Sequence, residues 1–160
     1  MEYIPTSSGS YALHIVLPAA QEIRIGRLGT FRFPAGNYLY TGSAHGPGGL
    51  RARLRHHVRP VANPHWHLDF LRPFAVLQNG WYTLENGALE CAWSKALQGQ
   101  GGGLIPARGF GAADCHNRCH SHLVYFPSDL SRAEIEARLS FLETRIMSIT
   151  FFDLSSFAAR

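Results

Sequence analysis

Short apolar runs separated by turn residues fill the first third of the chain, and this pattern predicts β-strands. Apolar and polar residues alternate within several of these runs. Proline- and glycine-containing clusters at residues 18–20 and 34–37 separate them. We therefore expect a meander of strands over residues 10–17, 21–25, 30–33 and 38–41.

The rest of the chain mixes helical and extended patterns. The glycine-rich turn at residues 45–49 leads into a helix that ends before Pro60. Asn63 with Pro64, Asn86, and Ser131 with Glu134 are start signals for three further helices. These signals predict helices over residues 50–58, 65–71, 88–97 and 131–146, strands within 75–84 and at 123–126, and a glycine-rich loop at 98–103.

The element order predicts one α+β domain over residues 1–160. We expect a small, mainly antiparallel central sheet flanked by helices, with an added hairpin between Pro18 and Pro34 and a C-terminal helical extension over residues 127–160. The chain has 160 residues, of which 46% are hydrophobic, and this composition excludes a disordered protein.

No apolar run approaches the roughly 18 residues of a membrane span, and the N-terminus lacks the pattern of a signal peptide. We therefore expect a cytoplasmic protein with no membrane partner.

The basic residues favour a polyanionic partner. The formal net charge is +4, and Lys95 is the only lysine among the fifteen basic residues. The planar guanidinium of arginine suits bidentate contact with phosphate oxygens. A high genomic GC content would produce the same preference for arginine, so this signal leaves both explanations open.

Two tyrosine–glycine signatures flank the predicted meander, at Gly9-Ser10-Tyr11 and at Tyr40-Thr41-Gly42-Ser43-Ala44. An arginine-rich helix follows the second signature. This order resembles the GIY-YIG nuclease superfamily, and the segments 65–69, 90–91, 109–115 and 121–123 extend the resemblance to its Uri-type branch. Members of that branch are small domains found alone or fused to base-excision glycosylases. The resemblance covers about residues 9–126 and implies a GIY-YIG-like fold and endonuclease activity.

The geometry of the predicted helix over residues 50–58 determines which of its side chains face the sheet. Successive residues are about 100° apart, so Leu50, Leu54 and Val58 form its buried stripe. Arg53 and His57 then lie at the edge of that stripe, facing the sheet. A cation in this position needs an anionic partner, and the resemblance selects the same arginine as catalytic. The alternative is a structural arginine paired with a carboxylate.

The resemblance also implies a single metal-binding glutamate, which falls on Glu90 in the first turn of its predicted helix. Its position could equally reflect the helix dipole, and Glu85 is the fallback candidate. One carboxylate plus water is a common ligand set for Mg²⁺, and Mg²⁺ or Mn²⁺ would suit phosphodiester cleavage.

The implied mechanism is in-line hydrolysis in which Tyr11, Tyr40 or a histidine orients or deprotonates water. A free tyrosine is a poor base at neutral pH, so we expect Arg53 or the metal to lower its pKa. His57, one helical turn after Arg53, could share the proton transfer.

The cysteines and histidines are harder to interpret. Three cysteines without a secretory signal do not predict a disulfide framework. Cys91, Cys115 and Cys119, with His122, have the ligand types of a zinc site, whereas buried free cysteines are the default. His65 and His67 do not share a helical face, so a metal site made by that pair alone is not expected.

These observations lead to one main hypothesis and two alternatives. The main one is a metal-dependent endonuclease acting on nucleic acid, DNA in preference to RNA, with catalytic residues Tyr11, Tyr40, Arg53, His57 and Glu90, and nucleic-acid contacts from Gly42, Ser43, Arg51, Arg55 and Lys95. The alternatives are a nucleic-acid-binding module that does not cut, and a structural domain that binds only protein. A small domain of charge +4 would bind weakly at physiological salt, which favours a structured substrate or a protein partner that supplies specificity.

Overall fold

The computed structural model describes residues 3–99, 102–142 and 145–154, which form an α+β fold around one five-stranded sheet. The strand order is β6-β4-β1-β5-β9, and every neighbouring pair is antiparallel. The strands of this sheet are β1 (Gly9–Leu17), β4 (Gly36–Ala44), β5 (Val76–Thr83), β6 (Leu123–Phe126) and β9 (Thr150–Asp153). The predicted α+β fold with a mainly antiparallel sheet is confirmed.

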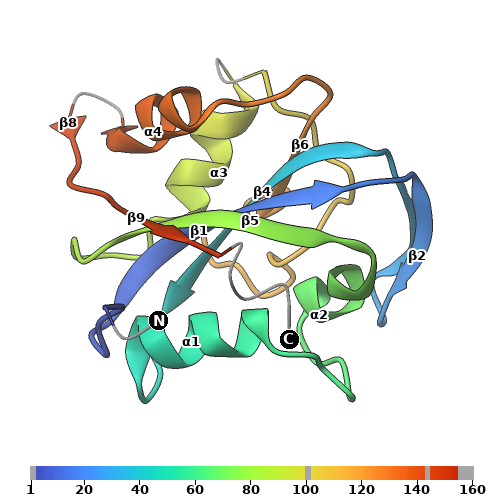
Figure 1. The fold of residues 1–160 in the computed structure, drawn as a ribbon, viewed down its shortest axis with the longest axis horizontal. Helices are drawn as coiled ribbons and strands as arrows, with labels where there is room; N and C mark the ends of the chain where they lie inside the picture. Colours follow the sequence, from blue (N-terminus) through green and yellow to red (C-terminus); the bar gives the residue numbers. More distant parts are fainter. Residues whose placement is uncertain (1–2, 100–101, 143–144, 155–160) are drawn as a thin grey trace.

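Helices cover both faces of the sheet (Figure 1). Helices α1 (Gly49–Val58) and α2 (His67–Leu71), the latter followed by a short 3₁₀ turn at Arg72–Phe74, cover one face. Helices α3 (Glu90–Gln98) and α4 (Arg132–Ser140) cover the other. Side chains alternate along β1, so Tyr11 and Leu13 pack toward α1 and α2, whereas Ala12 packs toward α3 and α4. The sheet therefore separates two hydrophobic cores.

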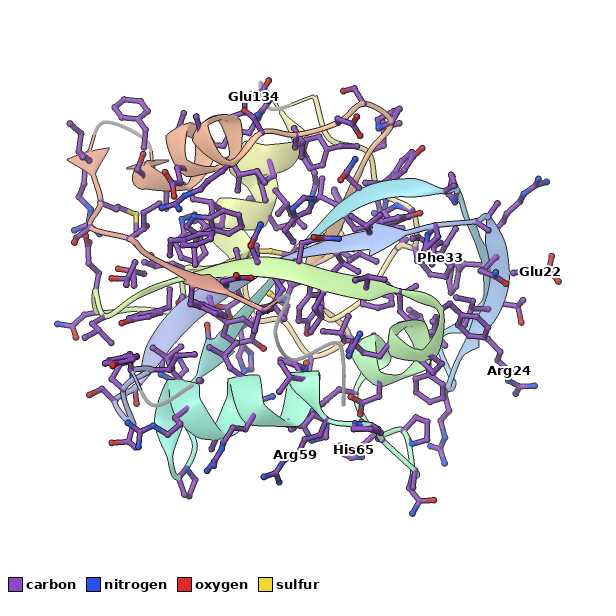
Figure 2. All side chains as sticks on the ribbon, in the orientation of Figure 1. Glu22, Arg24, Phe33, Arg59, His65 and Glu134 are labelled. Atoms are coloured by element: carbon purple, nitrogen blue, oxygen red, sulfur yellow. A yellow bond between two sulfur atoms is a disulfide. The ribbon has the colours of Figure 1, made fainter. Side chains whose placement is uncertain are left out.

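The predicted added hairpin is confirmed as β2 (Gln21–Ile25) paired with β3 (Gly29–Phe33), and β2 packs on α2. Glu22 and Arg24 point away from the body of the protein, as Figure 2 shows, while Phe33 is fully buried. The hairpin thus adds its apolar side to the core beneath the sheet.

Three predicted helix boundaries are wrong. Helix α2 begins at His67 rather than at residue 65, because the buried carboxylate of Asp69 accepts the backbone N–H groups of His65 and Trp66 and so caps the helix there. Helix α3 begins at Glu90 rather than at residue 88 and has no side-chain cap. Helix α4 has the predicted capping box, but it ends at Ser140.

The C-terminal extension is therefore not wholly helical. After α4 the chain forms the short strands β7 (Phe141–Leu142) and β8 (Arg145–Ile146), and then β9 pairs with β5 at the edge of the sheet. The ring of Phe152 lies over Gly80, where a Cβ atom would overlap it. Closing the edge of β5 in this way satisfies backbone groups that a longer α4 would leave exposed. Residues 100–101 of the predicted glycine-rich loop lie outside the described ranges.

Within the described ranges, no helix has both the length and the apolar composition needed to cross a membrane.

Candidate active site

A pocket of about 590 Å³ lies beside the C-terminal end of β4, which extends past the residues that pair with β6. Strand β6 pairs with residues 37–40 of β4 only, and Gly42 and Ser43, farther along β4, line the pocket. Six parts of the chain contribute to it: β1, β4, α1, the turn that leads into α2, the start of α3 and the loop at 109–122. Its lining includes Tyr11, Tyr40, Gly42, Ser43, Arg53, His65, Trp66, His67, Glu90, Gly111, Asp114, Cys115, His116 and His122.

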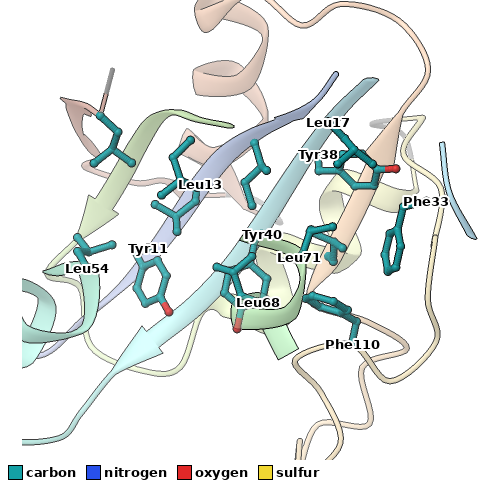
Figure 3. Close-up of a cluster of buried hydrophobic side chains, with 14 of the residues drawn as sticks. Tyr11, Leu13, Leu17, Phe33, Tyr38, Tyr40, Leu54, Leu68, Leu71 and Phe110 are labelled. Atoms are coloured by element: carbon teal, nitrogen blue, oxygen red, sulfur yellow. The ribbon is translucent and has the colours of Figure 1, made fainter. Parts of the chain in front are cut away.

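The two tyrosines share a face because of the β1–β4 register. Tyr11 lies opposite Gly42 and Leu13 opposite Tyr40, so the Tyr11 and Tyr40 rings are neighbours with centroids 6.4 Å apart. Figure 3 shows both hydroxyl groups pointing in the same direction. A Cβ on residue 42 would overlap the Tyr11 ring and its hydroxyl oxygen, so glycine is required for this approach.

His57 lies behind Tyr11 rather than in the pocket. Its Nε2 atom is 2.7 Å from the Tyr11 hydroxyl oxygen, and only 1% of the residue is exposed. Burial is the main cause that lowers the pKa of His57 to about 3, and the nearby His56 and Arg53 lower it further. His57 is therefore neutral at pH 7 and holds the Tyr11 hydroxyl without contacting a molecule in the pocket.

Both tyrosine hydroxyls remain protonated at neutral pH, contrary to the expectation that Arg53 lowers a tyrosine pKa. Burial raises the pKa of Tyr11 well above its usual value, and the charge of Arg53 opposes this only in part. Burial likewise raises the pKa of Tyr40 to about 12. The free energy that a phenolate loses when it is removed from water is larger than the free energy that one neighbouring cation restores.

Arg53 faces the pocket stacked on an aromatic ring. Its guanidinium carbon is 4.2 Å from the centre of the Trp66 ring. Trp66 is fixed by Asp69, which accepts the Trp66 backbone N–H at 2.9 Å and also accepts from His56 Nε2 at 2.9 Å. Within the described ranges Arg53 forms no ion pair with a carboxylate. The alternative that Arg53 is a structural arginine paired with a carboxylate is therefore wrong within the part of the chain that the structure describes.

Glu90 is tied to the end of β4 from the opposite face of the sheet. The Thr41 hydroxyl donates to its backbone carbonyl at 2.8 Å, and the Ser43 hydroxyl donates to its carboxylate. Ser10, the middle residue of the first signature, accepts the Leu89 N–H at 3.0 Å and anchors the segment before α3. Glu90 and Asp114 both line the pocket, and carboxylate oxygens are ligands that Mg²⁺ or Mn²⁺ prefers.

Glu85, the fallback for Glu90, lies outside the pocket lining. Its carboxylate pairs with Arg145 at 2.6 Å and accepts the Ser148 N–H at 3.1 Å. Glu85 therefore fastens the C-terminal hairpin to the segment after β5.

The structure divides the predicted nucleic-acid contacts into two groups. Gly42 and Ser43 line the pocket. Arg51, Arg55 and Lys95 do not: Arg51 donates to the Ile4 carbonyl at 2.7 Å, and Arg55 and Lys95 are exposed on α1 and α3. These three residues can contact only parts of a ligand that extend beyond the pocket.

Sequence reasoning missed the supporting roles of Trp66, Asp69 and Asp114. The segment 65–69 was singled out, but no local pattern indicates that Asp69 is buried or that Trp66 stacks on Arg53. His65 and His67 both line the pocket, and His67 Nδ1 accepts the Gly111 N–H at 2.8 Å. His67 thus fixes the loop opposite Tyr40 in a structural role. His65 differs from His67 in that its side chain is exposed (Figure 2).

The cysteines gather beside the same pocket, and Cys115 is the one that lines it among the described residues. One ligand atom each from Cys91, Cys115, Cys119 and His122 all lie within 4.8 Å of one another. Cys91 and Cys119 form a disulfide with Cα atoms 5.9 Å apart, and Cys115 is a free thiol. The four residues named from the sequence as zinc ligands are therefore neighbours in space, although the disulfide was not expected.

Replacing Gly42 by alanine tests the close approach of Tyr11. We expect Gly42→Ala to lower the free energy of unfolding by about 1–3 kcal/mol, because the added methyl group displaces the Tyr11 ring. Urea denaturation measures this. Gly46→Ala is the matched control, since a Cβ there meets nothing within 4 Å. In a Tyr11→Ala background the cost of Gly42→Ala should vanish; an undiminished cost would contradict the assigned contact.

Burial of neutral His57 predicts a pH dependence of stability. Between pH 6.5 and about 3 the unfolded chain binds a proton at His57 that the folded chain does not. This contribution to stability is fully present above pH 6.5 and is lost as the pH falls, at about 1.4 kcal/mol per pH unit. Urea denaturation from pH 7 to 4 should show a shallower slope for His57→Gln than for the parent. The exposed-loop variant His45→Gln is the control, and equal slopes for His57→Gln and the parent would refute the prediction.

Comparison with known proteins finds no significant match among curated proteins or among solved structures. A protein family described as "Domain of unknown function DUF123" matches residues 10–143. The matched region runs from β1 past the end of α4 and includes every residue that lines the pocket. The chain belongs to the family described as Domain of unknown function DUF123.

Proposed function

We propose that this protein is a metal-dependent endonuclease that hydrolyses phosphodiester bonds in nucleic acid, with DNA as the preferred substrate. One observation carries the proposal: a single pocket joins Tyr11, Tyr40, Arg53 and Glu90, which come from four separate elements. These are the residues selected from the sequence by their resemblance to GIY-YIG nucleases. Structural needs alone do not account for a cation, a carboxylate and two phenols around one open cavity.

Arg53 is suited to hold the phosphate. Its guanidinium has no carboxylate partner among the described residues, and stacking on Trp66 fixes its plane beside the pocket. A fixed guanidinium offers two parallel N–H donors to phosphate oxygens. As the phosphorus becomes five-coordinate, negative charge grows on those oxygens, and a cation already in place stabilises that charge.

Tyr11 and Tyr40 act as hydrogen-bonding groups rather than as phenolate bases. Their raised pKa values keep both hydroxyls protonated at neutral pH. The contact of Tyr11 with His57 at 2.7 Å fixes the direction of its hydroxyl. In this role Tyr11 positions the attacking water in line with the leaving oxygen, which lowers the entropic part of the barrier.

Glu90 and Asp114, which both line the pocket, would hold the divalent ion, Mg²⁺ or Mn²⁺. Such an ion supplies Lewis-acid stabilisation of the developing charge. The hydrogen bond from Ser43 holds the Glu90 carboxylate toward the pocket. In the net reaction, water forms a bond to phosphorus, the bond from phosphorus to one sugar oxygen breaks, that oxygen is protonated, and the remaining water proton passes to solvent.

The substrate reaches beyond the pocket. The exposed Arg55 and Lys95 lie outside it and suit contacts with neighbouring backbone phosphates. A net charge of +4 gives only modest affinity at physiological salt, so a structured substrate or a protein partner that supplies specificity completes the proposal. Cytoplasmic location stays a prediction.

The second candidate function is nucleic-acid binding without cleavage. The high pKa values of Tyr11 and Tyr40 favour it, because neither tyrosine supplies a ready base. The two candidates share the same pocket and differ only in the chemical step.

Glu90→Gln tests the proposed chemistry. Labelled duplex, single-stranded, flapped and branched DNA, and RNA, are incubated with the protein in Mg²⁺, Mn²⁺ or EDTA. We expect metal-dependent cleavage by the parent and at least a 100-fold slower rate for Glu90→Gln, because the metal loses its anionic ligand. Glu85→Gln is the matched control, since Glu85 pairs with Arg145 outside the pocket lining.

Each alternative has its own outcome in this assay. Salt-dependent binding of the panel without cleavage would favour the non-catalytic module. No binding at low salt would overturn both proposals and leave a domain that binds only protein.

Arg53→Ala tests the phosphate contact. We expect the cleavage rate to fall about 100- to 1,000-fold, as for loss of one transition-state stabilising donor. Arg55→Ala, two residues along the same helix and exposed, should cost only a few-fold, through weaker backbone binding. Single-turnover rates at saturating protein separate the two effects, and equal losses in the two variants would show that Arg53 has no special role.

A further inference from the structure

We propose that Cys91, Cys115, Cys119 and His122 form a structural zinc site. Their ligand atoms all lie within 4.8 Å of one another. In a tetrahedral site with Zn–S bonds of about 2.3 Å, neighbouring sulfur atoms lie about 3.8 Å apart. The sulfur atoms of Cys91 and Cys115 are 3.9 Å apart. Three thiolates and one imidazole are a complete ligand set for structural zinc, and four protein ligands leave no position open for substrate.

His122 provides a second observation that points to a metal. The residue is only 5% exposed, and its Nε2 atom is buried without a hydrogen-bond partner. Its backbone is fixed, because its N–H donates to the Phe110 carbonyl at 2.8 Å and its carbonyl accepts the Thr41 N–H at 2.9 Å. A buried ring nitrogen left without a hydrogen-bond partner costs free energy. A bound ion at this cluster would explain why a histidine is held here.

The disulfide accounts for only part of the cluster. It uses Cys91 and Cys119 and leaves Cys115 as a free thiol beside them and His122 incompletely bonded. The same two sulfur atoms cannot form a disulfide and bind zinc as thiolates. Zinc is the state that gives all four side chains a role.

The loop that carries three of these ligands packs on the main core through Ala107 and Phe110, whereas its cysteine-bearing part does not. Residues 105–122 form turns without a regular helix or strand. Cys91, Ala112 and Cys119 form a small apolar cluster of their own, separate from the two main cores. A loop segment with so small an apolar cluster is commonly stabilised by a cross-link or a bound metal.

The position of the site gives it a second consequence. Cys91 follows Glu90 directly, so a zinc ion would join the start of α3 to the loop that carries Gly111 and Asp114. The ion would thereby fix one wall of the pocket. The assignment of zinc itself does not depend on the proposed nuclease activity.

Zinc content and thiol count test the inference together. The full chain is purified under reducing conditions without chelator, and its metal is measured by plasma mass spectrometry. Thiols are counted with Ellman's reagent after denaturation in EDTA and removal of the reductant. We expect about one zinc per chain and three reactive thiols, as all three cysteines are ligands. Absence of stoichiometric zinc, with either one thiol or three, would overturn the proposal in favour of a disulfide or of free cysteines.

Cys115→Ser separates the two states most sharply. The substitution removes a zinc ligand but leaves both partners of the Cys91–Cys119 disulfide. We expect this variant and His122→Gln to lose stoichiometric zinc, while His120→Gln, an exposed neighbour, retains it. Cobalt binding to the parent gives an independent readout, because tetrahedral thiolate ligation produces intense visible absorption. Retention of one zinc by Cys115→Ser, or no such cobalt spectrum from the parent, would refute the assigned ligand set.

Discussion

The close contact between Tyr11 and the backbone at Gly42 is the constraint on which the candidate site depends. The β1–β4 register places the Tyr11 ring where a side chain on residue 42 would otherwise lie. This placement brings the hydroxyl within 2.7 Å of His57 Nε2 and leaves Tyr40 on the same face. A shift of one residue in the register would turn Tyr11 to the other face of the sheet, and the pocket would lose it.

The pocket exists because two layers of the protein meet beyond the end of β6. Arg53 approaches from the helical layer below the sheet, and Glu90 begins α3 in the layer above it. Thr41 and Ser43 point toward α3 and bond Glu90, whereas Tyr40 points toward α1. The alternation of side chains along β4 thus supplies both walls of the site from consecutive residues.

Local patterns predicted the parts of the fold that depend on local interactions. The wheel of α1 identified the buried Leu50 and Leu54 and placed Arg53 at their edge, where the structure has it. Pattern analysis failed where contacts between distant residues decide the structure. Helix α4 was predicted to reach residue 146 but ends at Ser140, and the chain after it pairs with the edge of β5 as β9. It failed on the tyrosines for a similar reason. A cation near Tyr11 was expected from the sequence, but burial, which has the larger effect on the Tyr11 pKa, is a property of the folded protein.

The charges around the pocket explain why the proposed activity requires a metal. Arg53 attracts a phosphate, but Glu90 and Asp114 line the same pocket and repel it. The neutral His57 and the protonated Tyr11 add no charge to offset that repulsion at pH 7. A divalent cation at the carboxylates would turn the repulsive side of the pocket into an attractive one, so that a phosphate could lie between it and Arg53. Metal dependence should therefore extend to binding of the scissile phosphate and not only to its cleavage.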